Sequence, residues 1–266
     1  MLLRTLSALV LIPLVLALLL QGETLHLFLL FLPLSAGLIH EWLGFDGPVD
    51  RRLHLLMAAA AWLLLTTGFM GGVGWILVEV MLLYWGLLLM AIYRYQPGRM
   101  ESEVAGFHFR GLIYTVIPLL MALEIRALPA GGDLLCYLLF VIWATDSGAY
   151  LVGRAIGKRK MAPRLSPNKS WEGLIGGILL GVVVGFGTIR GFSLAIDPLW
   201  AVLLSFSVAL VGELGDLVES LFKREYGVKD SGTLIPGHGG LLDRLDSLLF
   251  ALPLFYFFLY WQNWFV

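Results

Sequence analysis

The sequence predicts an all-α, polytopic integral membrane protein with about nine transmembrane helices and a cytoplasmic N-terminus. Of its 266 residues, 59% are hydrophobic and 14% are charged, and the mean hydropathy is +0.87. A soluble domain carries roughly 25% charged residues. The apolar runs have the length of helices and lack the alternation of a membrane β-barrel, so we expect helices that satisfy their own backbone groups in lipid.

The first apolar run is a retained helix by this reading, because it is too long for a signal peptide and lacks a small-residue cleavage site before Gln21. The third and fourth runs are separated by Gly71 to Gly74. Trp261 and Trp264 of the last run have the character of an interfacial aromatic belt. The nine runs of about spanning length cover residues 2–20, 25–44, 53–70, 73–93, 109–128, 133–153, 171–189, 198–222 and 247–265.

The basic residues predict the orientation. With nine spans, all of the 18 Lys and Arg residues except Arg126 and Arg190 fall on the side of the N-terminus. The positive-inside rule places that side in the cytoplasm. We therefore expect a multi-pass protein of the cell membrane, in a bacterium the inner membrane, with a functional site that faces the cytoplasm.

The chain divides into N-terminal transmembrane helices, 1–130, and a C-terminal transmembrane catalytic region, 131–266. Two long inner loops, 154–170 and 223–246, belong to the second region, and loops of this length are usually functional or disordered. A net charge of −1 gives no reason to expect nucleic acid as a partner. A single cysteine, Cys136, excludes a disulfide framework within the chain and a cysteine metal cluster.

Three carboxylates lie within the run 198–222. Glu213, Asp216 and Glu219 share one broad helix face because they are spaced by three residues. Each charge costs at least about 2.5 kcal/mol at the centre of a membrane, so together they require a cation, a partner or a water-filled cavity. By helical rise, Asp146 of the run 133–153 reaches a similar depth. The alternative is that these groups make only structural contacts between helices.

The loop 223–246 has the composition of a nucleotide triphosphate site. Glycine-rich backbone with Lys and Arg can bind phosphates, while Asp243 and Asp246, one helical turn apart, can hold a hard cation such as Mg²⁺. In the loop 154–170, Ser170 is a good N-cap for the next helix, and Ser166 and Lys169 can attract phosphate to that helix N-terminus.

Glycines recur every four residues in the run 171–189 and form a stripe along one face of the predicted helix. The stripe indicates close packing against another helix, which could belong to the same chain or to a second copy in a dimer. The stripe consists of Gly173, Gly177, Gly181 and Gly185.

The motifs of the C-terminal half resemble those of the phosphatidate cytidylyltransferase (CDP-diacylglycerol synthase) family. The segment from Ser220 to Asp246 fits the family signature, and the resemblance covers the chain from about Trp143 to its end. Three positions differ from the usual residues, namely Ser147, Asn168 and Ser170. The matching positions are Asp146, Ala149, Tyr150, Ser166, Pro167, Trp171, Glu172, Gly173, Gly215, Asp216, Glu219, Ser220, Lys223, Arg224, Lys229, Asp230, His238, Gly239, Gly240, Asp243, Arg244 and Asp246.

The resemblance implies attack by a phosphatidate oxygen on the α-phosphorus of CTP, which gives CDP-diacylglycerol and pyrophosphate. Mg²⁺ is the implied cofactor, with a second metal ion as an option, and the implied partners are CTP, phosphatidate and membrane lipids. A homodimer through the membrane helices is a separate expectation, drawn from the glycine stripe. The implied metal ligands are Asp146, Asp216, Glu219, Asp243 and Asp246. The implied catalytic residues are Asp216, Lys223, Arg224, His238, Asp243 and Asp246, and the implied phosphate-binding residues are Ser166, Lys169, Ser170, Lys229, Gly239, Gly240 and Arg244.

Two other functions remain open on the sequence. A CTP-dependent polyprenol or lipid kinase would need similar phosphate contacts but would break a different bond of CTP. A cation or proton transporter would explain the intramembrane carboxylates, although it would not explain the glycine-rich loop.

Overall fold

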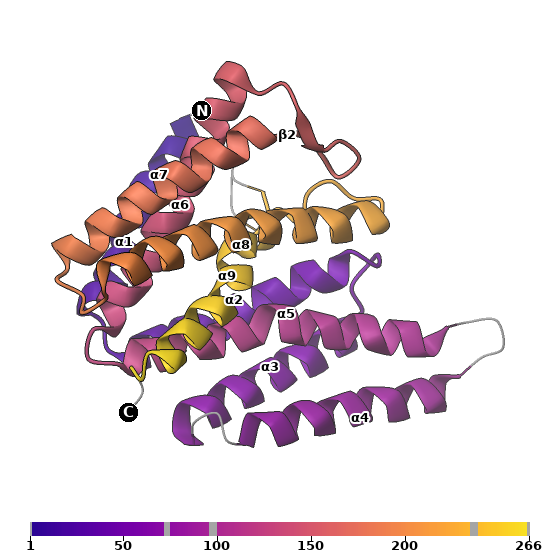
Figure 1. The fold of residues 1–266 in the computed structure, drawn as a ribbon. Helices are drawn as coiled ribbons and strands as arrows, with labels where there is room; N and C mark the ends of the chain where they lie inside the picture. Colours follow the sequence, from indigo (N-terminus) through magenta and orange to yellow (C-terminus); the bar gives the residue numbers. More distant parts are fainter. Residues whose placement is uncertain (1, 72–74, 96–99, 235–238, 265–266) are drawn as a thin grey trace.

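The computed structural model describes residues 2–71, 75–95, 100–234 and 239–264, and these residues form nine α-helices and one small sheet (Figure 1). The all-α prediction is thereby confirmed. The helices are α1 Leu2–Gln21, α2 Thr24–Gly44, α3 Arg51–Gly71, α4 Ile76–Arg94, α5 Glu101–Ala127, α6 Gly131–Ile156, α7 Trp171–Gly191, α8 Pro198–Glu225 and α9 Leu242–Trp261.

Each helix overlaps one of the predicted runs, and two helices begin five or more residues earlier than predicted. Helix α5 begins eight residues before the apolar run at 109, and α9 begins five residues before the run at 247. Both early turns are polar, since they contain Glu101 and Glu103 in α5 and Asp243 in α9. Hydropathy therefore could not reveal them. Of the described helices, α2 to α8 are long and apolar enough to cross a membrane.

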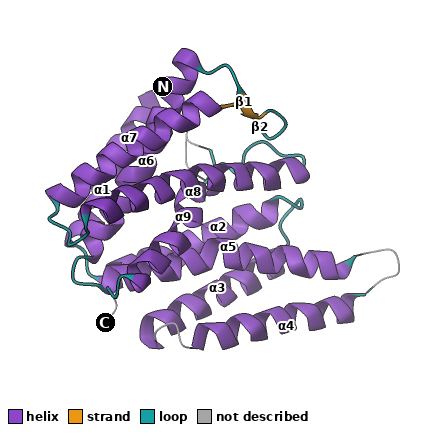
Figure 2. Ribbon diagram, in the orientation of Figure 1, coloured by secondary structure: helices purple, strands orange, loops and turns teal. Residues whose placement is uncertain are grey.

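The loop between α6 and α7 holds the one sheet of the described residues (Figure 2). Strand β1, Lys160–Ala162, pairs antiparallel with β2, Ser166–Ser170, in the register Lys160 to Ser170 and Ala162 to Ser166. Glu172 in the first turn of α7 accepts hydrogen bonds from the backbone N–H groups of Lys158 and Arg159. The hairpin is therefore attached to the N-terminus of α7.

Helix α9 lies between the two halves of the molecule. It packs against α8 and α6 on one side and against α5 and α2 on the other, an arrangement that can be followed in Figure 1. Its side chains are accordingly among the most buried, as Leu242, Phe255 and Leu259 show. The polar first turn of α9 is thus placed where the N-terminal and C-terminal helices meet.

The glycine stripe of α7 packs within the chain. A Cβ atom on Gly177 would lie 2.7 Å from the carbonyl oxygen of Thr145 and 3.0 Å from the Cβ of Ala149, both in α6. A Cβ on Gly185 would overlap the hydroxyl of Ser205 in α8. The predicted close packing is confirmed, and its partners are α6 and α8 of the same chain.

We predict that Gly177→Ala lowers the free energy of unfolding by about 1–3 kcal/mol, because the added methyl group forces α7 away from α6. The matched control is Gly187→Ala in the same helix, where an added Cβ meets no atom within 4 Å. Thermal unfolding of both variants in detergent measures the difference. Equal stability of the two variants would contradict this account of the packing.

Candidate active site

Lys169 joins the hairpin to α8. Its ammonium group lies 2.7 Å from Glu213 Oε2 and 2.9 Å from Asp216 Oδ2. Burial lowers the pKa of Lys169, but the carboxylates of Asp216 and Glu213 outweigh burial and raise the pKa above its ordinary value. A positive charge is thus fixed between two of the three carboxylates predicted on this helix.

Lys223 makes the corresponding link between α8 and α9. Its ammonium group donates to Glu219 Oε2 at 2.6 Å, one turn earlier in α8, and to Asp243 Oδ1 at 2.7 Å in the first turn of α9. The Glu219 side chain is 1% exposed. Since an unpaired charge at this depth is costly, Lys223 neutralises a carboxylate that water hardly reaches.

Asp243 organises the loop before α9. Its second carboxylate oxygen accepts hydrogen bonds from the backbone N–H groups of Ser231 and Gly240, both at 3.1 Å. A Cβ on Gly240 would overlap the Ser231 hydroxyl, so the close approach of the two segments requires glycine there. Gly239 has a φ of +84°, a left-handed backbone conformation that glycine adopts without the steric cost of a side chain. Both Asp243 oxygens are therefore engaged in fixing the loop.

Two further carboxylates, Asp146 of α6 and Asp246 of α9, lie close enough to Asp216 of α8 to interact with it electrostatically. Asp246 interacts electrostatically with Asp216 and with Asp146, and Asp146 interacts with Lys169 and Arg244. Asp246 is buried, whereas the Asp216 side chain is 38% exposed. The structure thus brings together the carboxylates that the sequence placed at a similar depth on separate helices.

The other predicted site residues lie around this cluster. Ser170 accepts a hydrogen bond from the N–H of Gly173 and caps α7, as predicted. Arg224 donates to the carbonyl oxygens of Leu165 and Val228 and so connects the hairpin to the end of α8. Ser166 begins β2 and Lys229 is exposed. His238 lies outside the described residues, so its predicted role stays a prediction.

Two residues of the N-terminal helices belong to the site and were not predicted. Glu41 of α2 is 2% exposed and accepts hydrogen bonds from the loop and from the start of α9. Tyr114 of α5 interacts electrostatically with Asp246, Glu219 and Asp216, and its buried hydroxyl has no hydrogen-bond partner within the described ranges. The only sequence signal for Glu41 is a lone acid near the inner end of its helix.

The cluster has the chemistry of a site for a hard cation. Its acidic side chains are Asp and Glu, whose carboxylate oxygens are ligands that Mg²⁺ prefers. Glu219 Oε1 is buried and has no hydrogen-bond partner in the described part of the chain. In this arrangement lysines lie between two carboxylate pairs, and among the described residues no three His, Cys, Asp or Glu side chains are grouped around one ion position.

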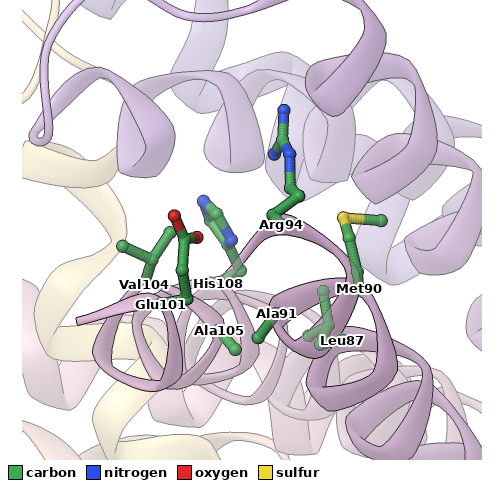
Figure 3. A pocket seen from close by; sticks show the side chains of 8 residues that line it. All are labelled: Leu87, Met90, Ala91, Arg94, Glu101, Val104, Ala105 and His108. Carbon is green, nitrogen blue, oxygen red and sulfur yellow. The ribbon is translucent and has the colours of Figure 1, made fainter. Parts of the chain in front are cut away.

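Two small cavities lie elsewhere in the molecule. One, of about 20 Å³, is lined by residues of α4 and α5 and contains Arg94, Glu101 and His108 (Figure 3). The other, of about 170 Å³, is lined by Arg94, His108 and residues of the α2–α3 connection, including Asp46 and Asp50. Neither is lined by a residue of α6 to α9, so both are separate from the charged cluster.

The fold and the site together define a polytopic membrane protein with a cluster of carboxylates and lysines at one end of its helices. Residues 2–262 match the model of the cytidylyltransferase family, and the chain belongs to this family. This assignment agrees with the resemblance found in the C-terminal motifs, and the match extends it over the N-terminal helices.

Three relatives show how far the similarity extends. The chain is 34% identical to the phosphatidate cytidylyltransferase of Staphylococcus epidermidis over 253 residues, 94% of this chain and 96% of that protein. It is 42% identical to the phosphatidate cytidylyltransferase of Haemophilus influenzae over 187 residues, 66% of this chain and 65% of that protein. It is also 42% identical to that of Bacillus subtilis over 174 residues, 65% of each chain. The last two alignments thus span slightly less than two thirds of the relatives.

We predict that Lys169→Met destabilises the protein by about 3 kcal/mol, because it leaves Glu213 and Asp216 without their shared cation. Lys160→Met is the control, since Lys160 is an exposed lysine of the same hairpin. Denaturant or thermal unfolding in detergent measures both variants. If the two variants unfold alike, the ion pairs of Lys169 do not stabilise the fold.

Proposed function

We propose that this chain transfers the cytidylyl group of CTP to phosphatidate and releases pyrophosphate. The family match over residues 2–262 and the relatives named phosphatidate cytidylyltransferase support this most directly. A phosphate oxygen of phosphatidate attacks the α-phosphorus of CTP, the bond to the β-phosphate oxygen breaks, and CDP-diacylglycerol forms. No protein nucleophile is required, so the chain has to position the substrates and neutralise charge.

Lys169 and Lys223 are the residues best placed to receive the phosphates. Each ammonium group is held by two carboxylates. An ammonium group carries three N–H bonds, and the third of Lys169 is directed to the backbone carbonyl oxygen of Glu213 at 3.3 Å. In our proposal they turn from carboxylate to phosphate oxygens when CTP binds. Lys229, Arg244 and the backbone N–H groups around Gly239 and Gly240 support the same phosphates, with Ser166 and Ser170 at the hairpin.

Mg²⁺ is the proposed cofactor, held by Asp146, Asp216 and Asp246 with Glu219 beside them; when bound, the ion would neutralise charge on the triphosphate. Asp243 contributes mainly by fixing the loop in this proposal, because its Oδ2 accepts from the backbone N–H groups of Ser231 and Gly240. A second metal ion stays a prediction. His238 keeps its predicted catalytic role as a proposal.

The proposed site faces the cytoplasm at the membrane surface, where CTP and inner-leaflet phosphatidate are both within reach. Arg126 and Arg190, the two basic residues predicted on the outer side, lie in the last turns of α5 and α7. The hairpin lies at the opposite end of α7, at its N-terminus. Pairing of two copies through the membrane helices also stays a prediction.

The reaction products test the proposed activity. We expect the purified protein to convert CTP and phosphatidate to CDP-diacylglycerol and pyrophosphate in the presence of Mg²⁺. Asp246→Asn should lower this activity by about 100-fold or more while the protein stays folded, because the variant loses a carboxylate of the metal site. The control is Asp133→Asn, which lies in the first turn of α6, far along that helix from Asp146.

Other products would replace the proposal with a rival function. Release of CDP together with a phosphorylated lipid would identify a CTP-dependent kinase. Cation or proton flux in proteoliposomes without CTP would identify a transporter. Wild-type turnover by Asp246→Asn would contradict the metal assignment alone.

Labelling of single cysteines tests the orientation. The native Cys136 is buried and should give little background. We expect a membrane-impermeant maleimide to label Ala195→Cys, in the connection between α7 and α8, in intact spheroplasts. Lys160→Cys, in the hairpin, should be labelled only after the membrane is opened. Labelling of Lys160→Cys in intact spheroplasts would reverse the proposed orientation.

A further inference from the structure

The start of α9 lacks a cap of its own. Leu241 is at the N-cap position, where it makes no capping hydrogen bond with its side chain. The first N–H groups of a helix have no partners within that helix and need acceptors from elsewhere, above all when they are buried. At the start of α9 the N–H of Asp243 donates to the Ser231 hydroxyl, and the N–H groups of Leu241 and Leu242 find acceptors on a residue about 200 positions earlier in the chain.

Glu41 of α2 supplies them. Glu41 Oε1 accepts a hydrogen bond from the N–H of Leu241 at 2.8 Å, and Oε2 accepts one from the N–H of Leu242 at 2.7 Å. Oε2 also accepts a hydrogen bond from the Ser231 hydroxyl at 3.1 Å. A carboxylate at this place is favoured by the dipole of α9, because the N-terminal end of a helix carries partial positive charge.

The hydrogen bonds of Glu41 lead directly into the charged cluster. Ser231, which donates to Glu41, also donates through its backbone N–H to Asp243 Oδ2, and its hydroxyl accepts from the N–H of Asp243. Asp243 in turn accepts from Lys223. Asp246 follows one turn later on the same helix. The position of Glu41 therefore bears on each acidic group that α9 presents to the site.

The surroundings of Glu41 hold it in place. A Cβ on Gly232 would lie 2.6 Å from Glu41 Oε1, so the loop passes directly over the carboxylate. The adjacent Trp42 donates from its indole nitrogen to the carbonyl oxygen of Phe107 at 3.0 Å and packs against Phe222 of α8, with 4.9 Å between ring centroids. Helix α2 is thus fixed to both α5 and α8 beside Glu41.

We propose that Glu41 is a positioning residue of the active site. By capping α9 from α2, it sets the place of Asp243 and Asp246 relative to the carboxylates and lysine of α8. The N-terminal helices thereby take part in assembling the site, beyond anchoring the chain in the membrane. This inference rests on the proposed cytidylyl transfer for its effect on activity, but the capping itself can be measured without turnover.

Hydrogen exchange measures the capping. In Glu41→Gln, which keeps the size of the side chain, the amides of Leu241 and Leu242 should exchange about fivefold faster or more, because an amide group cannot accept at both positions. Amides of residues 250–258 in the same helix should be unchanged. Unaltered exchange at 241 and 242 overturns the inference, whether or not the protein has the proposed activity.

Steady-state kinetics measure the positioning. We expect Glu41→Gln to lower kcat by about tenfold or more and to raise the Mg²⁺ concentration at half-maximal rate, with the KM for phosphatidate unchanged. Glu41→Asp, which keeps the charge, should recover part of kcat. Glu124→Gln is the control, since it removes a half-buried carboxylate of α5 outside the site.

The outcomes separate the possible failures. A wild-type protein without cytidylyl transfer refutes the proposed function and leaves the exchange result to decide the capping. Loss of kcat without a change in Mg²⁺ dependence, and without recovery in Glu41→Asp, shows general destabilisation and overturns the positioning role. If Glu41→Gln does not fold, Glu41→Asp is measured in its place. Its side chain is one methylene group shorter, so exchange at Leu241 and Leu242 should still be faster than in the wild type, and wild-type exchange there overturns the inference.

Discussion

The ion pair between Lys223 and Asp243 joins α8 to α9, and the same aspartate fixes the loop before α9. The lysine neutralises Glu219 on its own helix and holds Asp243, whose other oxygen fixes Ser231 and Gly240. Lys169 in the same way forms ion pairs with two carboxylates, those of Glu213 and Asp216. Because charges at this depth are tolerated only when they are compensated, the two lysines allow one end of the bundle to carry a high density of carboxylates. In the proposed reaction, the phosphates of CTP would replace the carboxylates at the lysines, and Mg²⁺ would compensate the carboxylates.

Local sequence patterns predict the helices and several contacts of the site. The helices follow from apolar runs of spanning length, and the largest differences at their starts are polar first turns, as at Glu101 and Asp243. Helical spacing alone placed Glu213, Asp216 and Glu219 on one face. The N-cap role of Ser170 follows from its residue type and position before α7. The glycine stripe indicated close packing, although it could not name α6 and α8 as the partners.

The contacts between distant segments could not be predicted in this way. Nothing in the spacing of Lys169 indicates that it reaches α8, because that contact depends on how the hairpin folds back from α7. Glu41 resembles any lone acid of a membrane helix until α9 is placed beside it. Tyr114 is hidden for the same reason, since only packing brings α5 against the carboxylates. Residue type and helical period determine which side chains share a face of one helix. Which faces of different helices come into contact depends on tertiary packing.

A double-mutant cycle on Lys223 and Asp243 tests the central claim most directly. The free energy of unfolding is measured for the wild type, Lys223→Met, Asp243→Asn and the double variant under identical detergent conditions. If the pair joins α8 to α9, Lys223→Met leaves Asp243 and Glu219 without their cation, and Asp243→Asn leaves Lys223 paired with Glu219 alone. The cycle then gives a coupling energy of about 1 kcal/mol or more. Additive effects of the two substitutions would show that the helices are held together by other contacts, and would contradict the account.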